Sequence, residues 1–401
     1  MKKTVCLLIA ARLFIVAAPA QTSIQHLLTE NRPDPIGLDA AMPRFSWQLI
    51  SDKRNVVQLA YDIQVFSSDN KKNPVWRSGK IQSEQSVFVP YAGNALQSGK
   101  KYKWLVEVWD NNSKTSVKSD TASFQMALLH VSDWKAKWIE PGYVEDSVMR
   151  PSPLFRKEFS TSKKIISATA YITSHGLYEA QINGKRISDA YFTPGWTSYN
   201  KRLQYNVYDI TNLLAKGNNA IAVTLGNGWY RGFIGFSGQQ NFYGKDIALL
   251  LQLEISYSDG TAETIVSDGS WKSSTGEIRS AEIYNGETID AREEKKGWAL
   301  PGYDDSKWNT VKTGNQSMNV LVATYNEVVK KKEIFKPLRI FKTPKGEQVI
   351  DFGQNLVGWV SIKVKGNAGD KIIVSHAEVM EKNGNFYTTN LRAAKHRIFI
   401  F

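Results

Sequence analysis

Hydrophobic and polar residues alternate with a period of two along most of the chain. The alternation is clearest in residues 60–66 and 101–109. It is typical of β-strands that bury one face and expose the other. Short runs rich in Asn and Gly, which favour tight turns, separate the alternating stretches at 110–112, 182–185, 258–261 and 382–385. Turns roughly ten residues apart predict an all-β chain made of tandem β-sandwich domains.

The pattern divides the chain after residue 20 into three β segments. Residues 21–128 contain enough strand candidates for one immunoglobulin- or fibronectin-like sandwich, and residues 129–315 predict a larger sandwich with aromatic-rich loops. A third segment covers 328–401 and ends in an apolar strand pattern at 397–401. We expect this last strand to leave a sheet edge without a partner, so that the third sandwich is incomplete. Helical periodicity is scarce, and only 210–216 indicates a single turn.

The first 20 residues differ in kind from the rest. Lys2 and Lys3 precede an apolar run over residues 5–18, and Ala18-Pro19-Ala20 fits the small-residue pattern of a signal-peptidase site. This arrangement predicts a signal peptide over 1–20 and a secreted or periplasmic protein, with an uncleaved interfacial helix as the alternative. No later apolar run reaches the ~18 residues that a transmembrane helix needs.

Cysteine content and charge narrow the chemistry. The only cysteine is Cys6, inside the predicted signal peptide, so the remaining chain can form no disulfide, Cys-based zinc site or cysteine nucleophile. The formal net charge is +13. Because the lysines are scattered through turns and strand ends, we expect a solvated surface and no nucleic-acid partner. A negatively charged cell envelope or an acidic polysaccharide stays open as a partner.

Several motifs resemble bacterial α-L-rhamnosidases, glycoside hydrolase family 78. The first segment resembles their N-terminal sandwich, the second their rhamnosidase N-terminal jelly roll, which has carbohydrate-binding relatives, and the third the start of their concanavalin-like domain. The motifs that carry the resemblance are, in chain order, 28–38, 43–47, 102–110, 176–186, 194–199, 225–232, 351–359 and 376–378.

The resemblance implies that the catalytic residues are not in this chain. The family places its general acid and general base, both carboxylates of an inverting mechanism, in a following (α/α)6 barrel, and the chain ends before such a barrel. The acidic pair Asp304-Asp305 does not replace them, because neighbouring residues of a strand point to opposite faces. We therefore expect an accessory portion of an α-L-rhamnosidase that acts on rhamnose-containing glycans, its barrel absent or separately encoded. A lectin-like protein without hydrolase activity is the alternative.

Two loops of the second segment carry the candidate binding residues. Sugars stack their apolar C–H faces on aromatic rings, and amide or guanidinium groups bond their hydroxyls. The loops supply both kinds of group and predict a carbohydrate site made of Trp196, Tyr199, Asn227, Trp229, Tyr230 and Arg231. The alternative for the glycine-rich loop at 226–232 is a bulge or turn at the rim of the sandwich.

The sequence requires no cofactor, but the resemblance also implies a calcium ion in the jelly-roll domain. In the related rhamnose-binding modules a calcium ion helps to hold the sugar through oxygen ligands, which suits its chemistry. By motif the ligands would be Asn183 and Asn227. The alternative for Asn183-Gly184 is a plain hairpin turn.

Overall fold

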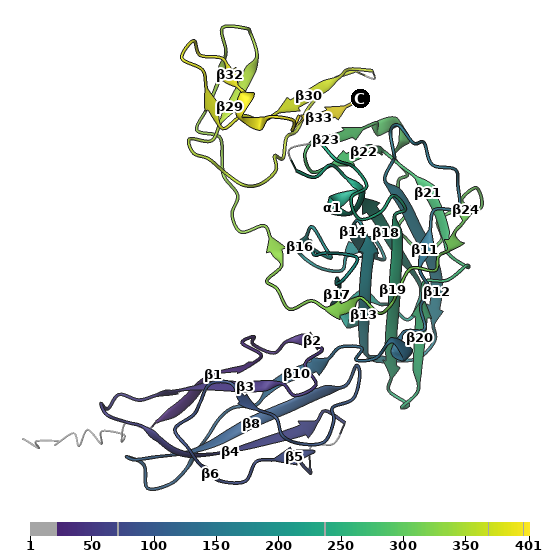
Figure 1. Ribbon diagram of the computed structural model, residues 1–401. Coiled ribbons are helices and arrows are strands. Elements are labelled where there is room, and N and C mark those ends of the chain that lie inside the picture. Colours follow the sequence, from purple (N-terminus) through teal and green to yellow (C-terminus); the bar gives the residue numbers. More distant parts are fainter. Residues whose placement is uncertain (1–21, 70–71, 236–237, 368, 396) are drawn as a thin grey trace, which may run out of the picture. The chain divides into compact units, whose positions relative to one another are not determined.

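A computed structural model describes residues 22–401 except 70–71, 236–237, 368 and 396 (Figure 1). The predicted signal peptide lies outside the described residues. The chain forms two compact units. The first contains the residues up to 35 together with 40–96 and 100–125, and the second contains 36–39, 97–99 and 126–401.

The first unit is a β-sandwich. One of its sheets has the strand order β1-β3-β7, and the other contains β10-β8-β4-β5, with β6 along β4 and β9 along β8. The strands are β1 (Ser23–Thr29), β3 (Arg44–Ile50), β4 (Gln58–Ser67), β5 (Trp76–Arg77), β6 (Ile81–Gln82), β7 (Val89–Pro90), β8 (Lys101–Asp110), β9 (Val117–Lys118) and β10 (Ala122–Met126).

Strand β8 confirms that the alternating pattern marks strands with one buried face. Its ten residues alternate without a break between partly exposed and buried. The buried indole of Trp104 donates its Nε1–H to Thr29 Oγ1 at 3.0 Å, and its ring centroid lies 4.5 Å from that of Phe45. Since buried N–H groups are costly without an acceptor, this hydrogen bond lets a large aromatic ring fill the core of the unit.

The second unit is dominated by two large sheets. The first has the order β25-β11-β19-β13-β17-β26, with β20 along β19, and the second has the order β15-β14-β18-β12-β21-β24. Their strands are β11 (Ile139–Glu140), β12 (Pro153–Thr161), β13 (Ile165–His175), β14 (Leu177–Ile182), β15 (Lys185–Arg186), β17 (Leu203–Asp209), β18 (Gly217–Gly226), β19 (Ala248–Tyr257), β20 (Ala262–Val266), β21 (Lys272–Thr275), β24 (Asn309–Thr310), β25 (Lys312–Thr313) and β26 (Leu321–Ala323).

Short elements complete this unit. A two-stranded ladder pairs β16 with β27, and one turn of α-helix, α1, follows β18. The bounds are β2 (Ile36–Leu38), η1 (Val131–Asp133), β16 (Ala190–Tyr191), η2 (Thr211–Leu213), α1 (Gly228–Arg231), β22 (Ile278–Glu282), β23 (Gly286–Ile289), η3 (Ala291–Glu293) and β27 (Val329–Lys330). The helical turn expected at 210–216 is the 3-10 turn η2.

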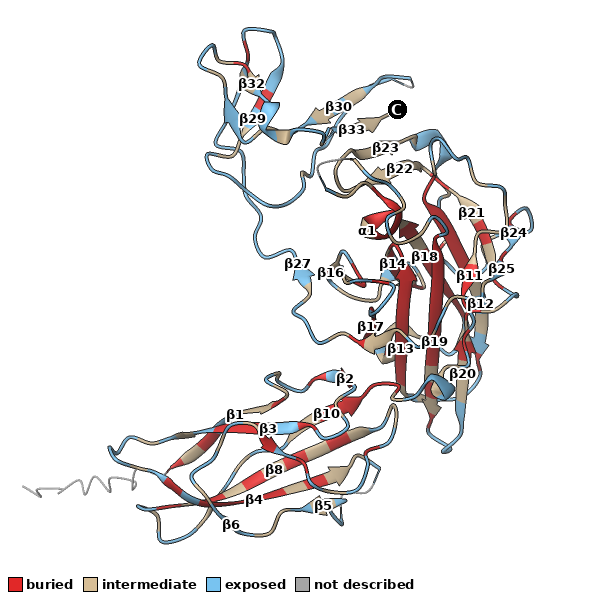
Figure 2. Ribbon diagram, viewed as in Figure 1, coloured by how far each residue is buried: buried red, intermediate tan, exposed pale blue. Residues whose placement is uncertain are grey.

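The core of the second unit lies between its two large sheets. Strands β13 and β19 run side by side and are almost entirely buried, as Figure 2 shows in red. Ile172 and Leu251 from the first sheet pack in one cluster with Ile221 and Val223 from the second. Because β19 is central, six consecutive residues at its start are buried. A run of buried residues of this kind is typical of a strand covered on both faces.

The predicted turns are confirmed where Asn or Gly supplies a left-handed backbone. Asn183 and Gly184 have φ values of 52° and 76° and close the hairpin between β14 and β15. Two successive positive φ values define the type I′ turn that fits the twist of a hairpin. Gly260, with φ 83°, closes the hairpin between β19 and β20 in the same region of backbone space.

The C-terminal segment contributes short strands and small sheets. They are β28 (Arg339–Lys342), β29 (Gln348–Asp351), β30 (Ile372–Ser375), β31 (Val379–Met380), β32 (Phe386–Tyr387) and β33 (Arg397–Ile400), with the 3-10 turn η4 (Thr389–Leu391). Hairpins pair β28 with β29 and β31 with β32.

The expectation that the last strand leaves an unpaired edge is wrong. Strand β33 lies inside a four-stranded sheet of order β22-β23-β33-β30. It pairs in parallel with β23 on one side and antiparallel with β30 on the other. Its partner β23 comes from a hairpin more than 100 residues earlier in the chain, so a local pattern could not reveal it.

The C-terminal segment nevertheless buries little of its apolar surface. Ile334 is 81% exposed and Leu338 is 72% exposed, and most of the segment is pale blue in Figure 2. Val349 is one of its few buried apolar residues. The incomplete concanavalin-like sandwich over 328–401 stays a prediction, as do the other domain boundaries.

Candidate functional site

The glycine-rich loop after β18 folds into the helical turn α1, where the sequence indicated a bulge or turn. Gly228 begins it with φ +53°, and a Cβ atom at this position would lie 2.6 Å from Leu177 Cγ. The left-handed backbone and the close approach both require glycine here. The turn buries Tyr230 and Arg231 and leaves Trp229 partly exposed.

Two predicted residues from different loops meet at the surface. The indole rings of Trp196 and Trp229 stack nearly parallel, with centroids 5.5 Å apart and an interplanar angle of 5°. Trp196 is 49% exposed and donates its Nε1–H to the hydroxyl of Tyr243 at 3.2 Å. Phe192 is 45% exposed, and its ring centroid lies 5.9 Å from that of Trp229. Phe192, Trp196, Trp229 and Tyr243 together form what we call the tryptophan platform.

Two other predicted residues lie beneath the surface. Tyr199 is buried, donates its hydroxyl to the carbonyl of Gly195 at 2.9 Å and meets the ring of Tyr230 edge-on. Tyr230 is buried and stacks on His175, with centroids 4.4 Å apart. Burial raises the pKa of both tyrosines and lowers the pKa of His175 to about 4. These rings therefore support the platform from inside.

Asn227 and Arg231 belong to a buried polar network. The Arg231 guanidinium lies 2.7 Å from Glu145 in an ion pair and donates from Nε to Asn227 Oδ1 at 2.5 Å. Asn227 donates in turn to Glu282 Oε1 at 2.9 Å. The other oxygen of Glu282 accepts from the backbone of Phe233, and burial raises the pKa of this carboxyl. The network holds α1 against two distant segments.

Asn183 has a structural role of its own. Its Oδ1 accepts from the backbone N–H of Ala220 at 2.9 Å, and its Nδ2 donates to the carbonyl of Leu213 at 3.0 Å and to Asn219 Oδ1 at 2.8 Å. These bonds fix the turn against β18, in agreement with the hairpin alternative.

One calcium ion does not fit both predicted ligands. Asn183 follows the end of β14 that pairs with Ile221, whereas Asn227 follows the end of β18 that pairs with Leu177. The six residues of β14 lie between the two positions and separate them by roughly 20 Å at ~3.3 Å per residue. The Asn227 oxygen also faces the Arg231 guanidinium, which disfavours a cation. In the described part of the chain, no three His, Cys, Asp or Glu side chains are grouped to hold a metal. Calcium binding by the jelly-roll domain stays a prediction.

Sequence reasoning missed four residues of this region. Phe192 and Tyr243 extend the platform, and Glu145 and Glu282 anchor α1. The aromatic pairs at 191–192 and 242–243 were a signal for Phe192 and Tyr243. No local pattern marks the two glutamates, because each comes from a segment far from the glycine-rich loop.

Known proteins share both the sequence and the fold of this chain. Family models match successively for the Rha78A-like N-terminal immunoglobulin domain (24–130), the alpha-L-rhamnosidase N-terminal domain (163–333) and the bacterial alpha-L-rhamnosidase concanavalin-like domain (341–400). An alpha-L-rhamnosidase of Alteromonas sp. (strain LOR) is 38% identical over 375 residues, which are 90% of this chain and 40% of the relative. One from Formosa agariphila is 35% identical over 383 residues, covering 92% and 41%.

Solved structures of rhamnosidases also share the fold of this chain. The native rhamnosidase from Aspergillus terreus is 37% identical, with a TM-score of 0.88 over 95% of this chain and 44% of that chain. The Streptomyces avermitilis alpha-L-rhamnosidase complexed with L-rhamnose is 27% identical, with a TM-score of 0.88 over 95% of this chain and 53% of that chain. The chain spans about two fifths of the length of the curated relatives that it matches.

An immunoglobulin-like sandwich followed by a larger β-sandwich, each matched by a rhamnosidase family model, places the chain among glycoside hydrolases. The chain belongs to the bacterial α-L-rhamnosidases, glycoside hydrolase family 78, and corresponds to the N-terminal portion of its members. The family resemblance and the all-β tandem-sandwich fold inferred from the sequence are confirmed. Among the described residues, no helix has the length and apolar character to cross a membrane.

Proposed function

We propose that this chain serves an α-L-rhamnosidase as its accessory portion and binds rhamnose-containing glycans on the tryptophan platform. The stacked pair formed by the exposed Trp196 and the partly exposed Trp229 is the observation that carries the proposal. A solvent-facing indole presents a flat apolar surface that matches the C–H face of a sugar ring. The support from relatives is that the Streptomyces avermitilis protein was solved with L-rhamnose.

The buried residues beneath the tryptophan platform, Tyr230 and Arg231, hold it rigid. Trp229 is carried by α1, whose Arg231 is clamped by Glu145 and whose Tyr230 is stacked on His175. Trp196 is oriented by its hydrogen bond to Tyr243. A preformed platform binds without first ordering its side chains, which reduces the entropic cost of binding. In this proposal the catalytic carboxylates belong to the part of the α-L-rhamnosidases that this chain, which spans about two fifths of its curated relatives, does not match.

Titration with L-rhamnose tests the platform. We expect weak binding, roughly millimolar, which corresponds to about 4 kcal/mol, with the sugar–indole stack supplying about 1 kcal/mol of it. Trp229→Ala is expected to abolish measurable binding in calorimetry or ligand-observed NMR. Trp109→Ala is the matched control, since it removes another partly exposed indole, from strand β8 of the first unit. Equal losses in both variants, or none in either, would reject the proposal.

Export is part of the same proposal, since glycans of this kind lie outside the cell. The support is the sequence pattern of residues 1–20. Mass spectrometry of the protein recovered from the periplasm or medium is expected to find Gln21 as the first residue. A chain that retains Met1 to Ala20 would contradict export through a cleaved signal peptide.

A further inference from the structure

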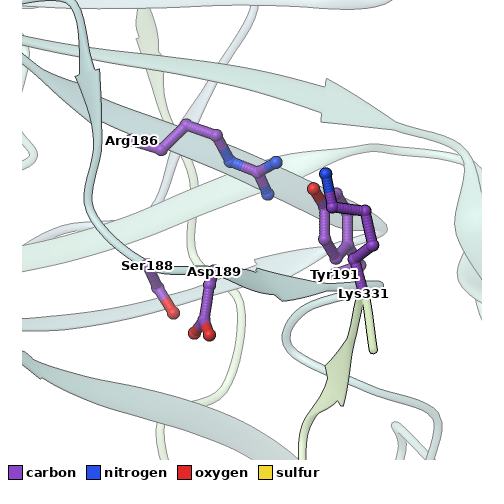
Figure 3. Close-up of a pocket in the computed structure, with 5 residues that line it drawn as sticks. All are labelled: Arg186, Ser188, Asp189, Tyr191 and Lys331. Carbon is purple, nitrogen blue, oxygen red and sulfur yellow. The ribbon is translucent and has the colours of Figure 1, made fainter. Parts of the chain in front are cut away.

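A polar pocket lies beside the β16–β27 ladder and takes no part in the tryptophan platform. It is open to solvent, has a volume of about 440 Å³ and is lined by Arg186, Ser188, Asp189, Tyr191 and Lys331 (Figure 3). Tyr191 directly precedes Phe192 of the platform, but none of the five lining residues belongs to the platform. The pocket is therefore a separate recess next to the proposed rhamnose surface.

Arg186 is held in place as a wall of this pocket. Its guanidinium lies over the ring of Tyr191, 4.3 Å from the centroid, and donates to the carbonyl of Ala190 at 3.0 Å. Glu179 lies 3.3 Å from the same nitrogen, Nη2. A guanidinium fixed by a ring and a carbonyl keeps a preorganised edge for an anion or a hydroxyl oxygen.

Of the basic side chains around the pocket, Lys331 is the one without a carboxylate partner among the ion pairs of the described residues. Asp189 is paired with Lys330 at 3.0 Å, and Glu179 is paired with Arg186. No carboxylate lies within 4 Å of the Lys331 ammonium anywhere in the described ranges. Figure 3 shows the Arg186 guanidinium directed toward the side where Tyr191 and Lys331 are drawn, with Ser188 and Asp189 on the other side. The lining thus offers positive charge at one side and hydroxyl and carboxylate oxygens at the other.

We propose that this pocket binds an acidic sugar, one that carries a carboxylate or a sulfate ester. The anionic group would lie against Lys331 and Arg186, and the ring hydroxyls would bond Ser188, Asp189 and the Tyr191 hydroxyl. A volume of about 440 Å³ is within the range of small-ligand sites and leaves ample room for one sugar ring. The excess of 51 basic over 38 acidic side chains in the chain favours approach of an anionic glycan.

The test compares three sugars that differ at one carbon: D-galacturonic acid, galactose 6-sulfate and neutral D-galactose, each titrated into the full chain by ligand-observed NMR. We expect at least one acidic sugar to bind five-fold or more tightly than galactose. Which of the two binds identifies the anionic group. Because the cation is exposed, binding should weaken several-fold between 20 and 300 mM NaCl. Equal affinity for all three sugars, or affinity independent of salt, would overturn the proposal.

Variants locate the site. Lys331→Gln is expected to weaken binding of the acidic sugar at least three-fold, whereas Lys332→Gln, which removes the same charge from the next residue, is expected to leave it unchanged. Both lysines are exposed, so neither change threatens folding. Trp229→Ala should leave acidic-sugar binding intact, so that failure of the rhamnose platform and failure of this pocket are distinguishable. Equal effects of the two lysine variants would place the sugar elsewhere.

Discussion

The outer and inner halves of the glycine-rich loop region show how burial decides the role of similar residues. Trp196 and Trp229 stack at the surface and are accessible to a ligand, whereas Tyr199, Tyr230 and Arg231 are buried. The sequence assigned all of them to one sugar site, because aromatic and polar groups occur together in both loops. The structure divides them into a binding surface and its support. Each prediction below tests this division.

The largest effect on stability is expected when the buried polar network around Arg231 is broken. Arg231→Ala leaves Glu145 without its partner and removes the hydrogen bond to Asn227, so the free energy of unfolding should fall by about 3–5 kcal/mol. Urea titration measures the loss. Arg292→Ala, which breaks an ion pair of an exposed arginine with Asp290 at 2.6 Å, is the control and should cost far less. Similar losses in both variants would show that Arg231 is no anchor.

The next largest effect is expected from the protonation of His175, which makes the stability depend on pH. The pKa of His175 is lowered to about 4 in the folded chain from 6.5, so between these values the unfolded state binds more protons. Stability is therefore expected to decrease as the pH falls from 6.5 toward 4, by about 2 kcal/mol at pH 5. His175→Phe keeps a flat ring between Trp138 and Tyr230 and removes the titration. Its melting temperature should depend less on pH than that of the parent, and an unchanged profile would contradict this assignment.

A smaller energetic effect, but a specific one, is expected at the outer half. Trp196→Ala removes a half-exposed ring, so its melting temperature should stay within a few degrees of the parent. Rhamnose affinity should nevertheless fall five- to ten-fold, equivalent to about 1 kcal/mol. A fall in melting temperature as large as that of Arg231→Ala would show that the platform is part of the core.

The smallest effect on stability and rhamnose binding is expected from calcium at Asn183 and Asn227. The amides of Asn183 and Asn227 are engaged in hydrogen bonds at opposite ends of β14 and β18. Addition of calcium chloride or EDTA is expected to leave both the melting temperature and the effect of Trp229→Ala on rhamnose binding unchanged. Calcium-dependent rhamnose binding that is lost in Asn227→Ala would restore the calcium assignment.

The strands were predictable because their signal is local. The alternation of β8 and the Asn-Gly turn between β14 and β15 are properties of a few consecutive residues. The partner of β33 was not predictable in this way, since β23 lies more than 100 residues earlier. The residue types of the site were visible in the two loops. Their burial was not, because a tyrosine suits both a sugar surface and a core, and Glu145 and Glu282 reach the site from distant segments.

The central claim is that the surface pair of indoles, Trp196 and Trp229, and not the buried half of the loop, receives the sugar. A crystal structure of this chain soaked with L-rhamnose tests it most directly. The account predicts a sugar ring packed against the exposed face of Trp196 or Trp229, with Tyr230 and Arg231 unmoved. A sugar bound in contact with Arg231 and Asn227, with α1 displaced, would contradict it.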